Sequence, residues 1–238
     1  KIKIGYLPLY IKLYDDCGQD RTPLLAYTDR LVSLLEAQEL EVVRPADLCR
    51  THEEFDSAAA LFNAEDVDAV VTQHLAYSPS LESIDALLRL KAPIVVLDST
   101  PDYQLIAVAD HKNCIDNDHG IHGVQDMCCM LKKHHHPYTI CAGHPDGSNV
   151  IERVAGMCRA AAAKKAFQTA RIGSVGGSFT GMGDFMVSDE RCRQEIGATV
   201  QYMTPDDAAT YLAQVTDDEV EQELALDREQ FRVEVASE

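Results

Sequence analysis

The chain has 238 residues, 46% of them hydrophobic, so it is long enough for one large or two modest globular cores. Its net charge of −18 argues against nucleic acid and against an anionic membrane surface as partners, because both bind basic surfaces. No apolar run reaches the length of a membrane-spanning helix and no signal-like start is visible, so we expect neither a spanning nor a secreted protein.

The first hundred residues alternate between short apolar runs and segments with helical spacing. Predicted strands cover 2–8, 41–45, 67–73 and 92–100. Predicted helices cover 23–40, 51–65 and 80–90, with a capping box at Thr51 and Glu54 and with Ser80 as a cap. Apolar strands that alternate with helices are typical of a parallel sheet covered on both faces.

The same alternation restarts after Pro137, which follows a run of three histidines at 134–136. Further strands are predicted at 138–144, 170–177 and 198–203, and further helices at 148–167, 189–197 and 204–215. We therefore predict two successive Rossmann-like, doubly wound parallel-sheet domains, 1–136 and 137–238, the second of them incomplete. The start without methionine and the helix-like end suggest that both ends are cut from something longer.

Eight cysteines show neither a CxxC pair nor a zinc-like spacing. We interpret them as mostly buried free thiols in a reducing cytosol, which predicts a cytoplasmic protein. A redox role for the adjacent Cys128 and Cys129 is a remaining alternative.

Ligands of open α/β sheets bind beyond the carboxyl ends of the strands. That rule selects the loops 8–18, 74–80, 99–104, 144–148 and 176–185. Tyr10, Tyr14, Asp15 and Asp16 in the first loop are candidates for a polyol site, and His74 after the third strand is a candidate ligand contact. The alternatives are two packed tyrosines in a solvated loop and a half-buried histidine.

The stretch 118–127, DHGIHGVQDM, holds the densest set of polar candidates. His119 and His122 share a face if the stretch is helical, and Gln125 and Asp126 extend it. Two histidines and a distant acid make an incomplete metal site, whereas neutral imidazoles suit a hydroxyl-binding or proton-shuttling wall. The alternative is a polar helix start.

The glycine-rich segment 173–185, GSVGGSFTGMGDF, allows backbone to approach a ligand closely, or forms a plain flexible turn. It lacks the GxGxxG pattern of dinucleotide sites. The chain also shows no GxSxG elbow, phosphate-binding loop or HExxH motif. Residue patterns alone therefore indicate an α/β protein that handles a sugar or another small metabolite.

Taken in order, several segments resemble the L-fucose/L-arabinose isomerase family, in its fucose-isomerase-like branch. They are IGYLPLY, QHLAYSPSLESIDAL, PIVVLDST, HGIHGVQDM, AGH, RVAGMCRAA and RIGSVGGSFTGMGDF, and they cover essentially the whole chain. The resemblance implies an aldose–ketose isomerase that moves a proton between C1 and C2 through an enediol, with Mn²⁺ or another divalent metal.

Site residues follow from the same resemblance. His119 and His122 look like a polar pair that reaches a neighbouring subunit's active site, Met182 like a pocket wall, and Tyr10 and Tyr14 like a border of that pocket. The resemblance further implies a homo-oligomer, a trimer or hexamer, when the protein is intact.

The family's metal ligands and catalytic base fall later in the chain than Glu238. The resemblance thus predicts the N-terminal half of such an enzyme, which binds no metal and is inactive alone. A non-catalytic sugar-binding module is the alternative, since tandem α/β domains also hold sugars in receptors.

Overall fold

The computed structural model describes residues 1–103, 118–176, 181–185 and 187–232. By its internal contacts the chain divides into two compact units, Lys1–Lys165 and Ala166–Glu238. Each unit is described by itself below.

The first unit is built on a five-stranded sheet with the order β2-β1-β3-β4-β5. The strands are β1 (Ile2–Leu9), β2 (Leu40–Val43), β3 (Ala69–His74), β4 (Ile94–Asp98) and β5 (Tyr138–Ala142). Every pair of neighbours is parallel, which confirms the predicted α/β class. The order is one of the two common doubly wound arrangements.

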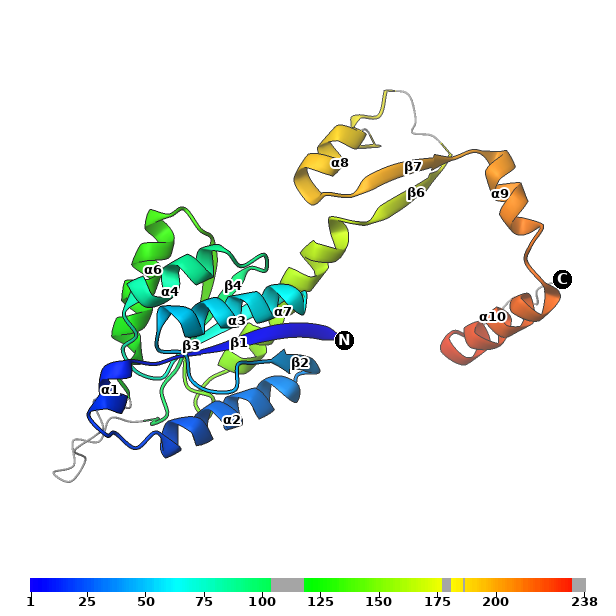
Figure 1. Cartoon of the computed structure of the whole chain (residues 1–238). Coiled ribbons are helices and arrows are strands. Elements are labelled where there is room, and N and C mark those ends of the chain that lie inside the picture. The colour runs from blue at the N-terminus through cyan, green and yellow to red at the C-terminus, as the bar shows by residue number, and fades with distance from the viewer. Residues whose placement is uncertain (104–117, 177–180, 186, 233–238) are drawn as a thin grey trace. The chain divides into compact units, whose positions relative to one another are not determined.

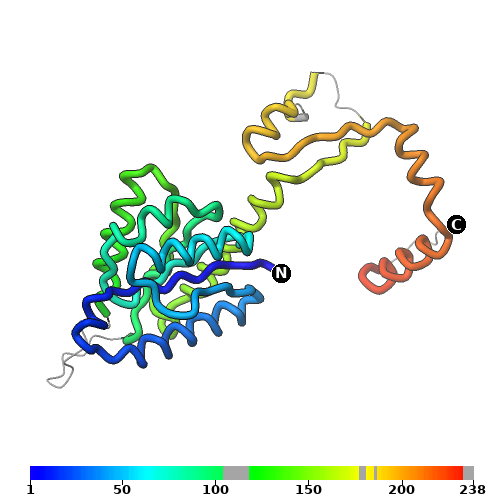
Figure 2. The backbone as a smooth tube through the Cα atoms, in the orientation of Figure 1, coloured from blue at the N-terminus to red at the C-terminus, as the bar shows by residue number. Residues whose placement is uncertain are grey.

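Helices cover both faces of this sheet (Figure 1). On one face, α2 (Thr22–Glu36) and α7 (Val150–Phe167) bury a cluster that includes Leu31 and Val154. On the other, α3 (His52–Ala64), α4 (Ser80–Leu88) and α6 (Gly120–Lys133) bury a second cluster. The tube view in Figure 2 follows the same path, with the chain returning to the sheet after each helix. Strands buried on both sides explain the continuous apolar runs in the sequence.

Two details of the first unit differ from the sequence expectation. A single turn of helix, α1 (Lys12–Asp16), follows β1 and was not predicted. Ser80 does not cap α4 with its side chain; its backbone amide donates to Asp126 of α6 instead, at 3.0 Å. The capping box of Thr51 and Glu54 is confirmed.

The predicted domain boundary at 136 differs from the division at 165. The strand after Pro137, β5, pairs with β4 in the register Ile94↔Tyr138 and so belongs to the first sheet. The helix that follows, α7, covers one face of that sheet. Pro137 therefore marks a connection between a helix and a strand within one unit.

The second unit contains a parallel pair, β6 (Arg171–Val175) and β7 (Thr199–Met203). Its helices are α8 (Asp189–Ile196), α9 (Pro205–Leu212) and α10 (Asp217–Gln230), with a 3₁₀ turn at Gly183–Phe185. Thr204 and Asp207 form a capping box, as the threonine before Pro205 predicts. Among the residues described in this unit, one, Ala198, is buried.

The seven cysteines within the described ranges are free thiols, as predicted. Cys49, Cys128, Cys141 and Cys158 are buried, whereas Cys17 and Cys129 are exposed. No helix in the described part of the chain is both long and apolar enough to cross a membrane.

Candidate functional site at the carboxyl edge of the first sheet

The strand order reverses direction at β1 and β3. The chain passes from β1 to β2 on one side and then crosses over to β3 on the other. Leu9, the last residue of β1, lies opposite His74, the last residue of β3. Ligands of doubly wound sheets bind outside the carboxyl ends of the strands at such a switch point. We therefore expect a ligand site at the segments that follow Leu9 and His74.

The segment after β1 carries two of the predicted site residues. Tyr10 is fully buried, and its ring meets that of Tyr14 edge-on at a centroid distance of 6.0 Å. Tyr14 lies on α1 and is partly exposed. Tyr10 thus packs against Tyr14 from the buried side. Of the two tyrosines, Tyr14 is the one that is partly exposed to solvent.

His119 is the residue on which the neighbouring segments converge. It occupies the N-cap position of α6, without a side-chain capping bond, and is partly exposed. Its Nδ1 lies 3.4 Å from the Tyr14 hydroxyl, and its ring lies 5.8 Å from that of Tyr77 in the segment after β3. The ring of His122, one helical turn on, meets it edge-on at 4.5 Å. Two aromatic rings and two imidazoles from three segments thus form one surface, which we call the His119 cluster.

The His119 cluster offers hydrogen-bond donors and acceptors together with aromatic faces. A neutral imidazole donates through one nitrogen and accepts through the other, and a phenol does both through its hydroxyl. Such groups can bind a ligand that is itself rich in hydroxyls, or pass a proton along a short chain.

Asp126 ties the segment after β3 to α6. Its carboxylate accepts hydrogen bonds from the Tyr77 hydroxyl at 3.2 Å and from the Ser80 amide at 3.0 Å. Burial, and then the charge of Asp126, raise the pKa of Tyr77. Tyr77 is therefore a protonated phenol at neutral pH, with its proton directed to Asp126. The sequence analysis did not single it out, although it lies in a loop that the strand-end rule selected.

His74 lies beneath α6 and does not contact solvent. Its side chain is 2% exposed, and neither ring nitrogen has a hydrogen-bond partner among the described residues. A Cβ at Gly123 would lie 2.5 Å from its Cδ2, so the helix can approach only because that position is glycine. Burial lowers the pKa of His74 to about 3, which makes it a neutral core histidine. His74 is therefore a buried core residue and not a member of the His119 cluster.

Two acids at the same edge have unusual surroundings. Asp98 ends β4 and Asp118 precedes α6; burial is the main cause that raises the pKa of each carboxyl. One oxygen of Asp118 accepts from the Asp102 amide at 3.4 Å, while the other is buried with no partner among the described residues. The sequence analysis named neither acid as a site residue, although Asp118 opens the stretch 118–127 and Asp98 lies near the end of the predicted strand 92–100.

The His119 cluster as defined does not include the other two predicted residues, Gln125 and Met182. Gln125 is exposed on α6. Met182 is 45% exposed and belongs to the second unit. Residues 177–180 of the glycine-rich segment lie outside the described ranges.

The described residues do not fit the Mn²⁺ ion that the family resemblance implies. No three His, Cys, Asp or Glu side chains are placed to share an ion anywhere in the described ranges. His119 and His122 contact each other through their rings, but three protein ligands are the usual minimum for a catalytic metal.

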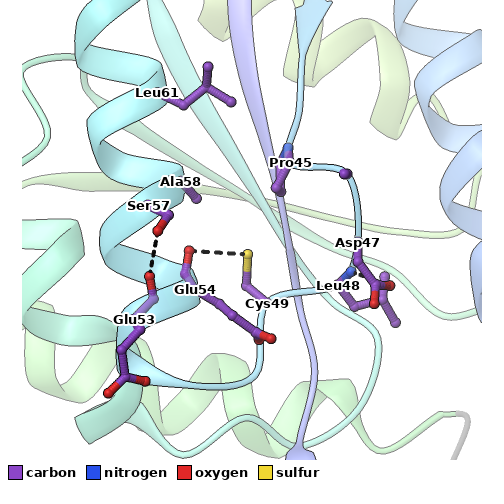
Figure 3. Close-up of a pocket in the computed structure, with 10 residues that line it drawn as sticks. Pro45, Asp47, Leu48, Cys49, Glu53, Glu54, Ser57, Ala58 and Leu61 are labelled. Carbon is purple, nitrogen blue, oxygen red and sulfur yellow. Dashed lines mark hydrogen bonds between the residues drawn. The ribbon is translucent and has the colours of Figure 1, made fainter.

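A separate pocket of about 410 Å³ lies between residues 45–49 and the outer face of α3 (Figure 3). Leu48, Ala58 and Leu61 give it largely apolar walls. The thiol of Cys49 donates to the backbone oxygen of Glu54 at 3.8 Å, and burial raises its pKa to about 12. A thiol that is protonated at neutral pH is a poor nucleophile, so this pocket is a weaker candidate for chemistry than the His119 cluster.

A scan of the chain against protein-family models finds no match. A search of curated proteins finds no significant match either. The predicted family membership therefore stays a prediction.

Proposed function

We propose that the His119 cluster binds the hydroxyl groups of a free sugar, and that the chain is part of an aldose–ketose isomerase. The observation that carries the proposal is the meeting of Tyr14, Tyr77 and His122 around His119, at the switch point of the sheet. The order of sequence motifs that resemble L-fucose/L-arabinose isomerases adds the reaction class.

The chemistry of the cluster favours a neutral polyol over an anion. The side chains that meet His119 are two phenols and an imidazole, none of which carries a fixed positive charge. The whole chain has a net charge of −18, which repels phosphates and carboxylates at long range. A sugar without a phosphate group is consistent with both observations.

In this proposal the described residues bind and orient the sugar. His119 and Tyr14 exchange hydrogen bonds with substrate hydroxyls in place of their mutual contact, and Tyr77, held by Asp126, provides an aromatic wall. The base that moves the proton and the ligands of the divalent metal are proposed to lie outside the described residues. A cytoplasmic location and a homo-oligomeric state also remain proposals.

Replacement of His119 tests the binding part of the proposal. Millimolar binding of L-fucose, L-arabinose or a related aldose to the chain should weaken about tenfold in His119→Ala, the loss of roughly 1.4 kcal/mol for one hydrogen-bonding group. His134→Ala, at the far end of α6 and exposed, is the matched control and should bind as the original chain does. Titration followed by NMR measures both constants.

Equal weakening in His119→Ala and His134→Ala, or no binding of any aldose, would contradict the proposal. Ketose formation from an aldose in the presence of Mn²⁺, by the protein at its full natural length, would support the isomerase. Sugar binding without ketose from any aldose would assign the chain to non-catalytic sugar binding.

A further inference from the structure

The position of α1 needs an explanation beyond apolar packing, because its contacts with the core come from the partly buried Tyr14 and the N-cap residue Ile11. It is five residues long, and isolated helices of that length are unstable in water. None of its residues, all of which the structure describes, is buried, and its N-cap residue makes no side-chain capping bond. Yet α1 carries Tyr14, whose hydroxyl must lie close to His119 for the site to exist.

Asp15, the residue after Tyr14, is held by two arginines. Arg50 Nη1 donates to its Oδ2 at 2.6 Å, and Arg21 Nε lies 3.2 Å from its Oδ1. Consecutive side chains of a helix point about 100° apart, so Asp15 can face the arginines while Tyr14 faces His119.

The arginines are themselves fixed by further carboxylates. The guanidinium of Arg50 donates to both oxygens of Glu54, at 2.7 and 3.2 Å, and Arg21 donates to both oxygens of Asp47, at 3.2 Å each. The hydrogen bond with Glu54 is the main cause that raises the pKa of Arg50. The side chains of Arg21, Arg50 and Asp15 are between 20% and 26% exposed.

This network differs from a pair of surface salt bridges. Bidentate arginine–carboxylate contacts in a connected, half-buried network are the geometry in which ion pairs fix a structure. The network joins α1 to Arg21, to the segment between β2 and α3, and to the first turn of α3. The other three segments are anchored in the sheet or its covering helices, whereas α1 has no fully buried residue and packs on the core through the partly buried Tyr14 and Ile11.

We infer that Arg50, together with Arg21, positions the proposed sugar site by holding Asp15 and thereby placing the Tyr14 hydroxyl against His119. The inference rests on the proposed function only for its effect on sugar binding; the placement of Tyr14 is independent of it. Arg50 is thus a positioning residue on the far side of α1 from the sugar.

The placement is measured directly by the nuclear Overhauser effect between the Tyr14 ring and the His119 imidazole. The signal should be lost in Arg50→Met and in Asp15→Asn, and partly restored in Arg50→Lys, which keeps the charge but loses the bidentate contact. Arg89→Met is the matched control, since it removes an exposed arginine paired with Asp56. Asp15→Asn is nearly isosteric and gives the answer should Arg50→Met not fold.

Sugar affinity provides the second measurement. Arg50→Met and Asp15→Asn should each weaken binding about fivefold, which corresponds to about 1 kcal/mol, and the double variant should add little, because both break one contact. Arg89→Met should leave affinity unchanged.

The two measurements separate failure of the inference from failure of the proposed function. An unchanged Tyr14–His119 signal in both folded variants would overturn the positioning role. Loss of that signal in a chain that binds no sugar would uphold the placement by Arg50 and overturn the sugar site.

Discussion

His74 shows how one residue's surroundings decide its role. A histidine directly after a buried strand satisfies the strand-end rule for ligands, and the sequence analysis counted it as a candidate. The structure places it under α6, because Gly120 and Gly123 let the helix come within contact of its ring and backbone. Nothing in the residues around position 74 reveals two glycines that lie far along the chain. Residue-scale prediction therefore selected the carboxyl edge of the sheet but could not distinguish the buried His74 from the partly exposed His119.

We expect the free energy of unfolding to fall in acid, because His74 is buried in its neutral form. Its folded pKa of about 3 lies below the value of 6.5 expected when it is exposed, so the unfolded chain takes up the proton first as pH falls. The free energy of unfolding should then fall below pH 6.5 by up to about 1.4 kcal/mol per pH unit from this residue. Urea unfolding between pH 4.5 and 7.5 measures it.

His74→Met removes the titrating group at similar volume and should flatten that part of the pH dependence, whereas the exposed His134→Met should not. If the free energy of unfolding of His74→Met depended on pH as that of the original chain does, His74 would not contribute to the pH dependence.

At the scale of the elements, periodicity predicted the helices and strands of the first unit well, since each buries an apolar face. Periodicity could not predict α1, because a single turn with no buried residue has no apolar stripe to detect. The sequence analysis named Tyr14, His119 and His122 of the His119 cluster but not Tyr77, because the contact of Tyr77 with His119 joins segments that lie far apart in the chain. The pairing of His119 with His122 was predicted, because it needs only one turn of helix.

We expect that the contact between α6 and His74, at the end of β3, tolerates no side chain at position 123. Gly123→Ala would place a methyl group 2.5 Å from the His74 ring, and we expect a loss of about 1–3 kcal/mol in unfolding free energy from the overpacking. Gly156→Ala in α7 is the matched control, since apart from its chain neighbours and the nearby backbone of its own helix no described atom lies within 4 Å of its Cβ position. It should stabilise the chain by about 0.5–1 kcal/mol. Thermal and urea unfolding compare the two; equal effects would contradict the close packing.

For the whole molecule, the sequence predicted the doubly wound class but placed the division too early. Three histidines and Pro137 after a helix look like a linker, and local composition does not record that the next strand pairs with β4. Strand pairing is a long-range property, which is why the boundary was the least predictable part of the fold.

A chain that ends at residue 167 should fold by itself, whereas one that ends at residue 136 should not. The shorter fragment lacks β5 and α7, whose Val150, Val154 and Cys158 complete one of the two buried clusters. Cooperative urea unfolding of 1–167, with molten or aggregated 1–136, is the expected outcome by circular dichroism. A cooperative transition for 1–136 would contradict the division at residue 165.

The distribution of thiols gives the molecule a natural attachment point for a probe. Burial keeps Cys49, Cys128, Cys141 and Cys158 protonated, since it raises the pKa of each, so an alkylating dye at neutral pH should leave them untouched. Cys17 is exposed and follows α1 directly, as its C-cap. Cys129 is exposed as well, and Cys192 is partly exposed. With these two and Cys114, which lies outside the described residues, replaced by serine, a fluorophore at Cys17 would report movement of that turn in solution.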